Sequence, residues 1–373
     1  MPGFTSWTTR AAGLAAAAAL LGAGGLSALP AAASAASPPF VLQWPYSQGA
    51  PMNEFNSNGL SFWGMDVEPL AFTTTNLTTY TPALAQSWQL SKNGRVLTVQ
   101  LRANDRFSNG QPVTAQDVQD AWALMYINGW VQGDDTAQVS VLGPRTIQFK
   151  RFATPDVTWE AGVLSEGIEA PFVYQQAGYL PKDAWTLIDE SLYTGKNPAK
   201  LALAKTAQSA MAKLAVKISA LEPTVDISDG PWTLSHVNAG EELWVRNPYF
   251  FNNKENHLST VIIRNGQTAQ EAFSWVLSGQ TTFSTGAFPL NVKEEALKRP
   301  GVHLAFQQIG QFCALNFNEH DYPYNMVQVR QALAYVMNRH SIQKIAEPVT
   351  GSYSAYQTGM TDSQASHGCR RRR

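Results

Sequence analysis

The clearest pattern of apolar and polar positions runs from Thr81 to Met125. Its first half predicts a β-hairpin, because a short strand at residues 88–90 leads into an Asn-Gly step at residues 93–94, whose backbone tolerates the positive φ of a tight turn. A second strand follows with apolar residues at every other position, a period that puts one face of the strand against a core. That face consists of Leu97, Val99 and Leu101.

The second half of this block predicts a helix. Gly110 breaks the chain, and Pro112 keeps the residue before it extended. Thr114, with Asp117 three residues later, resembles the capping box of a helix start. Apolar residues then recur at i, i+3, i+4 and i+7, which is the spacing of one helix face. They are Val118, Ala121, Trp122 and Met125.

The rest of the chain predicts further strands and helices in outline. The expected elements are a first strand at residues 40–43, a hairpin of strands 139–142 and 146–150 joined by Gly143-Pro144, a long Ala-, Lys- and Leu-rich helix at about residues 199–221, and a helix that starts at Thr268. Strands and helices therefore share one chain.

The block from Thr81 to Met125 also resembles a family signature. Extracytoplasmic solute-binding proteins of peptide-type ABC importers (family 5, the oligopeptide-, dipeptide- and nickel-binding family) carry a segment P-x-L-A-x-S-W-x-x-S-x-x-G-x-x-x-T-x-x-L-R-x-x-x-x-F-x-x-G-x-P-x-T-A-x-D-V. The matching residues here are Pro82, Leu84, Ala85, Ser87, Trp88, Ser91, Gly94, Thr98, Leu101, Arg102, Phe107, Gly110, Pro112, Thr114, Ala115, Asp117 and Val118.

Later segments resemble the same family in the expected order. Ser228–Trp232 is similar to its G-T-G-P-Y stretch, and Leu243–Phe250 to its x-R-N-P-x-Y-W stretch. Cys313–Asn318 resembles the family's strand L-x-F-N, and Val329–Arg339 its helix V-R-x-A-L-x-x-A-x-D-R. The resemblance covers roughly residues 40–354.

The resemblance implies a periplasmic-binding-protein-like α/β fold with two lobes (type II, the large peptide-binding class). It predicts lobe I over residues 36–265, including an inserted subdomain at about residues 65–190, and the start of lobe II over residues 266–360. Because family members continue for roughly another domain, we expect a C-terminally truncated chain with an incomplete second lobe. Residues 361–373, which end in four Arg, are expected to be an unstructured and artefactual tail rather than an electrostatic one.

Residues 1–35 predict a secretory signal peptide. Arg10 precedes an uncharged Ala-, Leu- and Gly-rich stretch, and Ala33-Ser-Ala35 offers small residues for cleavage. A retained signal anchor is the alternative, since the stretch approaches the ~20 residues that span a bilayer. The only cysteines are Cys313 and Cys369, so a lipobox Cys is missing. We expect an exported protein at the extracellular or periplasmic side of the membrane, without a lipid anchor.

The composition argues against a nucleic-acid partner and against a fold held together by disulfide bridges. Leaving out Arg10 and Arg370–Arg373 leaves 22 basic against 28 acidic residues, a net charge of −6, and this mildly acidic body argues against nucleic-acid binding. The low cysteine content suits a large exported protein held by its core. A bridge between Cys313 and Cys369 is not expected, because Cys313 is assigned to an apolar strand and Cys369 to the tail.

Candidate ligand-binding residues come from the aromatic content of 11 Trp, 12 Tyr and 17 Phe, which could supply stacking faces for a peptide or a sugar. The family resemblance implies that the loop after the first strand lines the ligand cleft. The predicted ligand-binding residues are therefore Trp44, Tyr46 and Ser47 in that loop, with Trp63 and Trp232 as further candidates. Trp88 and Trp122 lie on periodic apolar faces, so we predict that they pack in the core.

Catalytic and metal-binding motifs are incomplete. Ser341 and Lys344 match S-x-x-K, but S-D-N and K-T-G partners are absent. Gly59 and Gly64 have Walker spacing, but Met65 follows instead of the Lys. The six His residues show neither i, i+3 or i+4 pairing nor an H-E-x-x-H motif. We therefore predict a protein that is not an enzyme and that needs no cofactor or metal.

The predicted function is the substrate-binding component of an ABC importer, a monomer that captures peptides outside the membrane and delivers them to the permease subunits. Three alternatives stay open. An oligosaccharide-binding member of the same family would use the Trp residues for stacking. A truncated chain could be a nonfunctional remnant. An exported hydrolase is the third alternative, and the sequence argues against it because no motif supplies a nucleophile, a base and an orienting group together.

Overall fold

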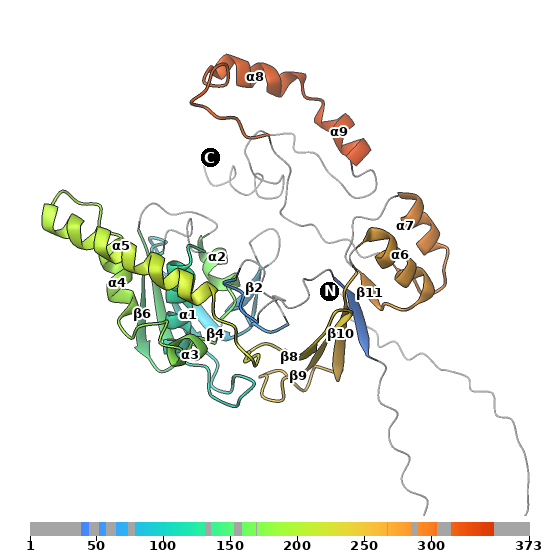
Figure 1. The fold of residues 1–373 in the computed structure, drawn as a ribbon, viewed down its shortest axis with the longest axis horizontal. Coiled ribbons are helices and arrows are strands. Elements are labelled where there is room, and N and C mark those ends of the chain that lie inside the picture. Colours follow the sequence, from blue (N-terminus) through green and yellow to red (C-terminus); the bar gives the residue numbers. More distant parts are fainter. Residues whose placement is uncertain are drawn as a thin grey trace, which may run out of the picture. The chain divides into compact units, whose positions relative to one another are not determined.

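Two sheets carry the fold of the chain (Figure 1). The computed structural model describes residues 39–44, 52–56, 65–73, 79–130, 136–152, 159–168, 170–266, 268–284, 290–303 and 315–346. The chain divides into two units, Met1–Pro38 and Pro39–Arg373. The predicted signal peptide falls in the first unit and the predicted Arg-rich tail in the second, and both lie outside the described residues.

The first sheet has five strands in the order β11-β1-β10-β9-β8. β1 lies parallel to both of its neighbours, whereas the β10-β9 and β9-β8 pairs are antiparallel. The strands are β1 (Phe40–Gln43), β8 (Trp232–Val237), β9 (Glu241–Arg246), β10 (Thr260–Arg264) and β11 (Phe283–Ser284). The chain therefore leaves this sheet after β1 and returns to it almost two hundred residues later.

The second sheet has four antiparallel strands in the order β4-β5-β7-β6. Both predicted hairpins are confirmed, and Gly94 has the positive φ of 66° that its turn requires. Leu97, Val99 and Leu101 of β5 are 0–1% exposed, because their alternation puts one face of the strand on the core. The strands are β4 (Ala85–Leu90), β5 (Val96–Leu101), β6 (Thr136–Gly143) and β7 (Thr146–Arg151).

The helix α1 (Ala115–Ile127) begins at the predicted capping box. The Thr114 hydroxyl accepts a hydrogen bond from the Asp117 amide at 3.3 Å, and the Asp117 carboxylate accepts one from the Thr114 amide at 2.8 Å. Trp122 is fully buried, as predicted, and its ring centroid lies 5.0 Å from that of Phe149 on the four-stranded sheet. The cap and the apolar face thus fix both the start of α1 and its orientation.

Four more helices complete the packing around this sheet. They are α2 (Trp159–Ser165), α3 (Phe172–Gln176), α4 (Ala184–Ser191) and α5 (Pro198–Ser219), and α5 confirms the predicted long helix. The last carbonyls of a helix have no partner within the helix. Here the Asn53 amide donates to the carbonyls of Ile218 at 2.7 Å and Leu221 at 2.8 Å, and the Tyr174 hydroxyl donates to Asn53 Oδ1 at 2.9 Å.

The segment Ser228–Trp232 connects the two sheets. The Gly230 amide donates to the Asp66 carbonyl and the Trp232 amide to the Met65 carbonyl, both at 2.9 Å. The Asn247 side chain, which is fully buried, donates to the Gly230 carbonyl at 2.9 Å. A Cβ at Gly230 would lie 2.5 Å from the Met65 carbonyl oxygen, so only glycine permits this approach.

One strand pair and four helices remain among the described elements. They are the two-stranded pair β2 (Ala71–Thr73) and β3 (Tyr80–Pro82), and the helices α6 (Ala269–Ser278), α7 (Leu290–Leu297), α8 (Val327–Val336) and α9 (Arg339–Ala346). α6 begins at a second capping box, formed by Thr268 and Glu271. The range predicted for the inserted subdomain contains the four-stranded sheet, but the division into lobes stays a prediction. No described helix is long and apolar enough to cross a membrane.

One predicted strand is wrong in the part that the structure describes. Residues 315–318, which belong to the segment matched to the family's L-x-F-N strand, form no strand, and Leu315 is 67% exposed. A strand needs a partner for its backbone hydrogen bonds, and none of the described strands pairs with these residues. The resemblance to the family's L-x-F-N segment alone therefore does not make these residues a strand. Cys313 lies outside the described residues.

Replacing Thr114 by Ala removes the side-chain half of the α1 cap, so we expect Thr114→Ala to lower the free energy of unfolding by about 1 kcal/mol. Urea unfolding followed by circular dichroism measures this. Thr206→Ala is the matched control, because Thr206 is an exposed residue inside α5. We expect that control to change stability by less than about 0.5 kcal/mol. Equal effects of the two substitutions would contradict a role for the cap.

Candidate ligand-binding site

The carboxyl ends of three parallel strands meet at one edge of the five-stranded sheet. Gln43, the last residue of β1, pairs with Arg264 at the end of β10 and with Ser284 at the end of β11. In open α/β sheets, ligands bind outside the carboxyl ends of the strands, where connections leave in different directions. This edge, formed by Gln43, Trp44, Arg264, Gly266 and Ser284, is the candidate site and is called the strand-end site below.

The Gln43 side chain holds the strand-end site together. It is 5% exposed, its amide donates to the Gly266 carbonyl at 3.1 Å, and its carbonyl oxygen accepts from the Ser284 hydroxyl at 3.2 Å. A Cβ at Gly266 would lie 2.7 Å from Gln43 Nε2 and 3.0 Å from the Trp275 ring. One amide therefore fixes the distance between the ends of β1, β10 and β11.

An aromatic side chain and a cation flank this amide. The backbone amide of Trp44 donates to the Arg264 carbonyl at 3.0 Å, and the Trp44 residue is 45% exposed. The Arg264 guanidinium donates to Gln280 at 3.2 Å and lies 6.0 Å from the centre of the Trp275 ring. An exposed indole can stack on a ligand, and a guanidinium can bind a carboxylate or a polar group. The arrangement suits binding rather than bond cleavage.

The structure describes two of the five predicted ligand-binding residues. Trp44 lies at the strand-end site. Trp232 is 7% exposed and packs in the hydrophobic cluster of the five-stranded sheet, at the start of β8. Tyr46, Ser47 and Trp63 lie outside the described residues. A ligand-binding role for each of these five residues stays a prediction.

Sequence reasoning missed Gln43, Arg264, Gly266 and Ser284. None of them belongs to a motif, and about 220 to 240 residues of chain separate Gln43 from the other three. The only local indication was that Gln43 ends a predicted strand. A strand end points to a binding site only once the strands that pair with it are known.

A carboxyl group lies on the apolar face of the same sheet. Glu242 in β9 is fully buried, and the Trp244 indole donates to its Oε2 at 3.0 Å. Burial raises the pKa of Glu242 to about 7, although the bond from Trp244 opposes the shift. The desolvation cost of a charged carboxylate exceeds the gain from one hydrogen bond. Glu242 is therefore mostly protonated at pH values well below 7.

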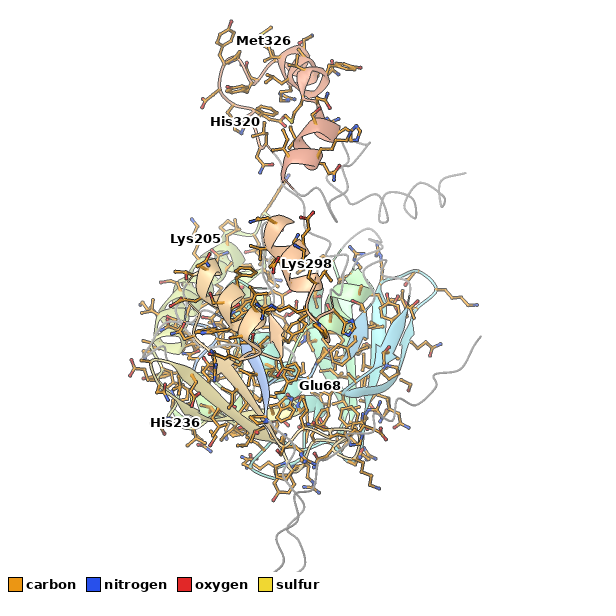
Figure 2. All side chains as sticks on the ribbon, turned by 90° about the vertical axis from the view of Figure 1, so that its right-hand side faces the viewer. Glu68, Lys205, His236, Lys298, His320 and Met326 are labelled. Carbon is orange, nitrogen blue, oxygen red and sulfur yellow. The ribbon has the colours of Figure 1, made fainter. Side chains whose placement is uncertain are left out.

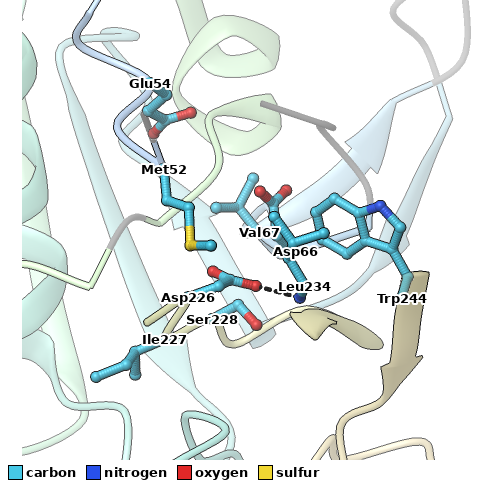
Figure 3. A pocket seen from close by; sticks show the side chains of 9 residues that line it. All are labelled: Met52, Glu54, Asp66, Val67, Asp226, Ile227, Ser228, Leu234 and Trp244. Atoms are coloured by element: carbon cyan, nitrogen blue, oxygen red, sulfur yellow. Dashed lines mark hydrogen bonds between the residues drawn. The ribbon is translucent and has the colours of Figure 1, made fainter. Parts of the chain in front are cut away.

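A small cavity lies beside this face (Figure 3). Its volume is about 30 Å³, and its lining includes Met52, Asp226, Leu234 and Trp244. The Asp226 carboxylate accepts hydrogen bonds from the Leu234 amide at 2.6 Å and the Thr233 hydroxyl at 3.0 Å, and burial raises its pKa. The space suits a single water molecule and is too small for a peptide or a sugar.

The family model for bacterial extracellular solute-binding proteins, family 5, matches residues 79–367. This chain belongs to that family. Its sequence is 23% identical to the nickel-binding periplasmic protein of Escherichia coli strain K12 over 319 residues, which cover 83% of this chain and 53% of that protein. The chain resembles the family over most of its own length, as predicted.

Solved structures share the fold at low identity. The oligopeptide-binding protein AppA of Bacillus subtilis, in complex with a nonapeptide, has a TM-score of 0.61 at 16% identity, over 87% of this chain and 58% of that one. A periplasmic oligopeptide-binding protein of Thermotoga maritima, with mannohexaose bound, has a TM-score of 0.58 at 15% identity, over 82% of this chain and 52% of that one. The chain spans about half the length of these relatives.

The nickel-binding relative raises the question of a metal site. Among the described residues, no group of three or more His, Cys, Asp or Glu side chains could hold a metal ion. The described part of the strand-end site carries amide, indole, hydroxyl and guanidinium groups, and these favour an organic ligand over a metal ion.

The close approach at Gly266 leads to a prediction for the strand-end site. Gly266→Ala would push a Cβ into Gln43, whose amide is held at both ends, so we expect a loss of about 1–3 kcal/mol in the free energy of unfolding. Gly240→Ala is the control, because a Cβ there would meet only Asn238 Oδ1, at an ordinary 3.6 Å. Thermal and urea unfolding compare the variants. Equal stability would show that Gln43 moves aside without cost.

The buried carboxyl group predicts a pH dependence. Because the folded-state pKa of Glu242 is raised from 4.5 to about 7, its contribution to stability is complete below pH 4.5 and is lost as the pH rises through 7. Glu242→Gln keeps an acceptor for Trp244 and cannot ionise. Between pH 5 and pH 8, we expect the unmodified chain to lose about 2.5 kcal/mol more than this variant.

The control for this pH dependence is Glu241→Gln. Glu241 is the neighbouring residue of β9, so its side chain points to the opposite face of the sheet. That variant should keep the pH dependence of the unmodified chain in urea unfolding. Parallel stability curves for the Glu242→Gln variant and the unmodified chain would contradict the assignment.

Proposed function

We propose that this protein is the substrate-binding component of an ABC importer, which captures peptides outside the membrane and delivers them to the permease subunits. The observation that carries the proposal is the family match over residues 79–367. The peptide-bound relative from Bacillus subtilis supports the choice of ligand. We further propose export through residues 1–35, a monomeric state, and the division into lobes at about residue 265.

The chemistry of the strand-end site supports this choice of ligand. A bound peptide presents amide groups at regular spacing, and proteins often bind such a chain through main-chain hydrogen bonds, with pockets or rings for its side chains. The strand-end site brings the ends of three strands together beside an exposed indole and a guanidinium. These groups offer stacking for an apolar peptide side chain and a charge for a peptide carboxylate.

Oligosaccharide binding is the second candidate, because the relative from Thermotoga maritima has mannohexaose bound. An exposed indole also stacks on sugar rings, so Trp44 suits this ligand as well. A nonfunctional remnant would bind neither ligand. A hydrolase is disfavoured, since the family and the named relatives are described as binding proteins.

The test of the function is calorimetric titration of the full chain with a mixture of di- to pentapeptides and, separately, with mannohexaose. We expect binding of the peptides, and we expect Trp44→Ala to weaken it about tenfold, which is the effect of losing one aromatic contact of about 1.4 kcal/mol. Native mass spectrometry identifies the peptides that bind from the mixture. Competition between these peptides, added singly, then gives the affinity of each.

Trp130→Ala is the matched control for this titration. Trp130 is 41% exposed and follows α1, where its ring contacts Phe55 at a centroid distance of 4.8 Å. It is far in sequence from the strand-end residues and should leave peptide affinity unchanged. Binding of mannohexaose alone would favour the oligosaccharide alternative, and binding of neither probe would favour a nonfunctional remnant.

A further inference from the structure

A second cavity lies beside the connection between the sheets. Its volume is about 480 Å³, within the range of small-ligand sites. The side chains of Phe72, Pro231 and Phe251 line its apolar part, and Glu68, Arg102 and Asn252 line its polar part. None of the strand-end residues lines it, so the two sites are distinct.

Glu68, in the polar part of this cavity, belongs to a group of three buried acids. Glu68, Asp105 and Asp229 are 3%, 1% and 0% exposed, and Glu68 lies among the side chains between the two sheets (Figure 2). Asp229 Oδ1 accepts a hydrogen bond from the Glu68 backbone amide at 3.0 Å, while Asp229 Oδ2 has no hydrogen-bond partner among the described residues. Each carboxylate repels at least one of the others. Of the three, Glu68 lines the cavity itself.

The guanidinium of Arg102 forms its hydrogen bonds with backbone carbonyls and not with these acids. Arg102 donates through Nε to the Ala83 carbonyl and through Nη2 to the Pro82 carbonyl at 3.3 Å, and its guanidinium lies 4.5 Å from the centre of the Phe251 ring. In the part of the chain that the structure describes, none of the three acids has an ion-pair partner within 4.0 Å. Arg102 offsets their negative charge only at longer range.

Burial therefore dominates the protonation of these acids. Desolvation raises the pKa of Glu68 to about 8 and that of Asp105 to about 7, against the opposing effect of Arg102, and it raises the pKa of Asp229 well above its usual value. A buried carboxylate without a counter-ion is costly, so it takes up a proton or gains a cation. The cavity next to Glu68 leaves room for a cation.

We propose that this cavity binds a small organic cation, with a primary ammonium group at Glu68 and an apolar body against Phe72, Pro231 and Phe251. Once ionised, the acids repel an anionic ligand. A metal ion does not fit either, because the described acids do not form a group that could hold one. An ammonium group needs only one carboxylate and neighbouring acceptors, and aromatic rings attract both its charge and its hydrocarbon part.

The test titrates the full chain with 2-phenylethylammonium and with 2-phenylethanol, which has the same apolar body and no charge. We expect the ammonium to bind at least tenfold more tightly than the alcohol at pH 8. Its affinity should rise at least tenfold between pH 6 and pH 8, since Glu68 must lose its proton while the amine stays charged. Asp105, Asp229 and Arg102 face Glu68 and contribute to the same titration.

Two variants test the location. Glu68→Gln should weaken ammonium binding at least tenfold and remove its pH dependence, while Glu190→Gln, an exposed residue of α4, should change neither. Asn252→Trp fills the cavity without altering the acids and should abolish binding, which keeps the test open if the Glu68 variant misfolds. Trp44→Ala should leave ammonium affinity unchanged. Equal affinity for the alcohol, or unchanged binding in the Glu68 and Asn252 variants, would overturn the proposal.

Discussion

The fold depends on one hydrogen-bonded connection, the segment Ser228–Trp232. It brings the chain back to the five-stranded sheet after the four-stranded sheet and its helices are complete. Its backbone groups are buried between the sheets and would be costly without partners. Met65, Asp66 and the fully buried Asn247 side chain supply those partners. Gly230 makes the approach possible, because a Cβ would overlap the Met65 carbonyl.

This connection also determines where the two sites lie. By placing β8 beside β9, it allows β10 to pair with β1, and the ends of β1, β10 and β11 then form the strand-end site. The same connection brings Asp229 to Glu68 and Asp105, so the buried acids are a consequence of joining the sheets. Hydrogen bonds hold the strand-end site together, whereas the second cavity lies beside buried acids whose ionisation has no ion-pair partner among the described residues.

The local elements could be predicted because their causes are local. Three such elements are the hairpin turn at Gly94, the cap formed by Thr114 and Asp117, and the buried face of α1. Each depends on residues that are close together in the sequence. The strand expected at residues 313–318 was wrong in its described part for the opposite reason. Its resemblance to the family's L-x-F-N segment suggested a strand, but a strand also needs a partner, which the residues of one segment do not specify.

The sequence by itself determined the α/β class, the family and the elements of the block from Thr81 to Met125, because periodicity, caps and motif spacing are written along the chain. It also placed Trp44 next to the end of a strand. The tertiary structure alone decided that Gln43 meets Arg264 and Ser284, and that Glu68 meets Asp105 and Asp229. These contacts join segments tens to more than two hundred residues apart, and only the pairing of distant strands brings such residues together.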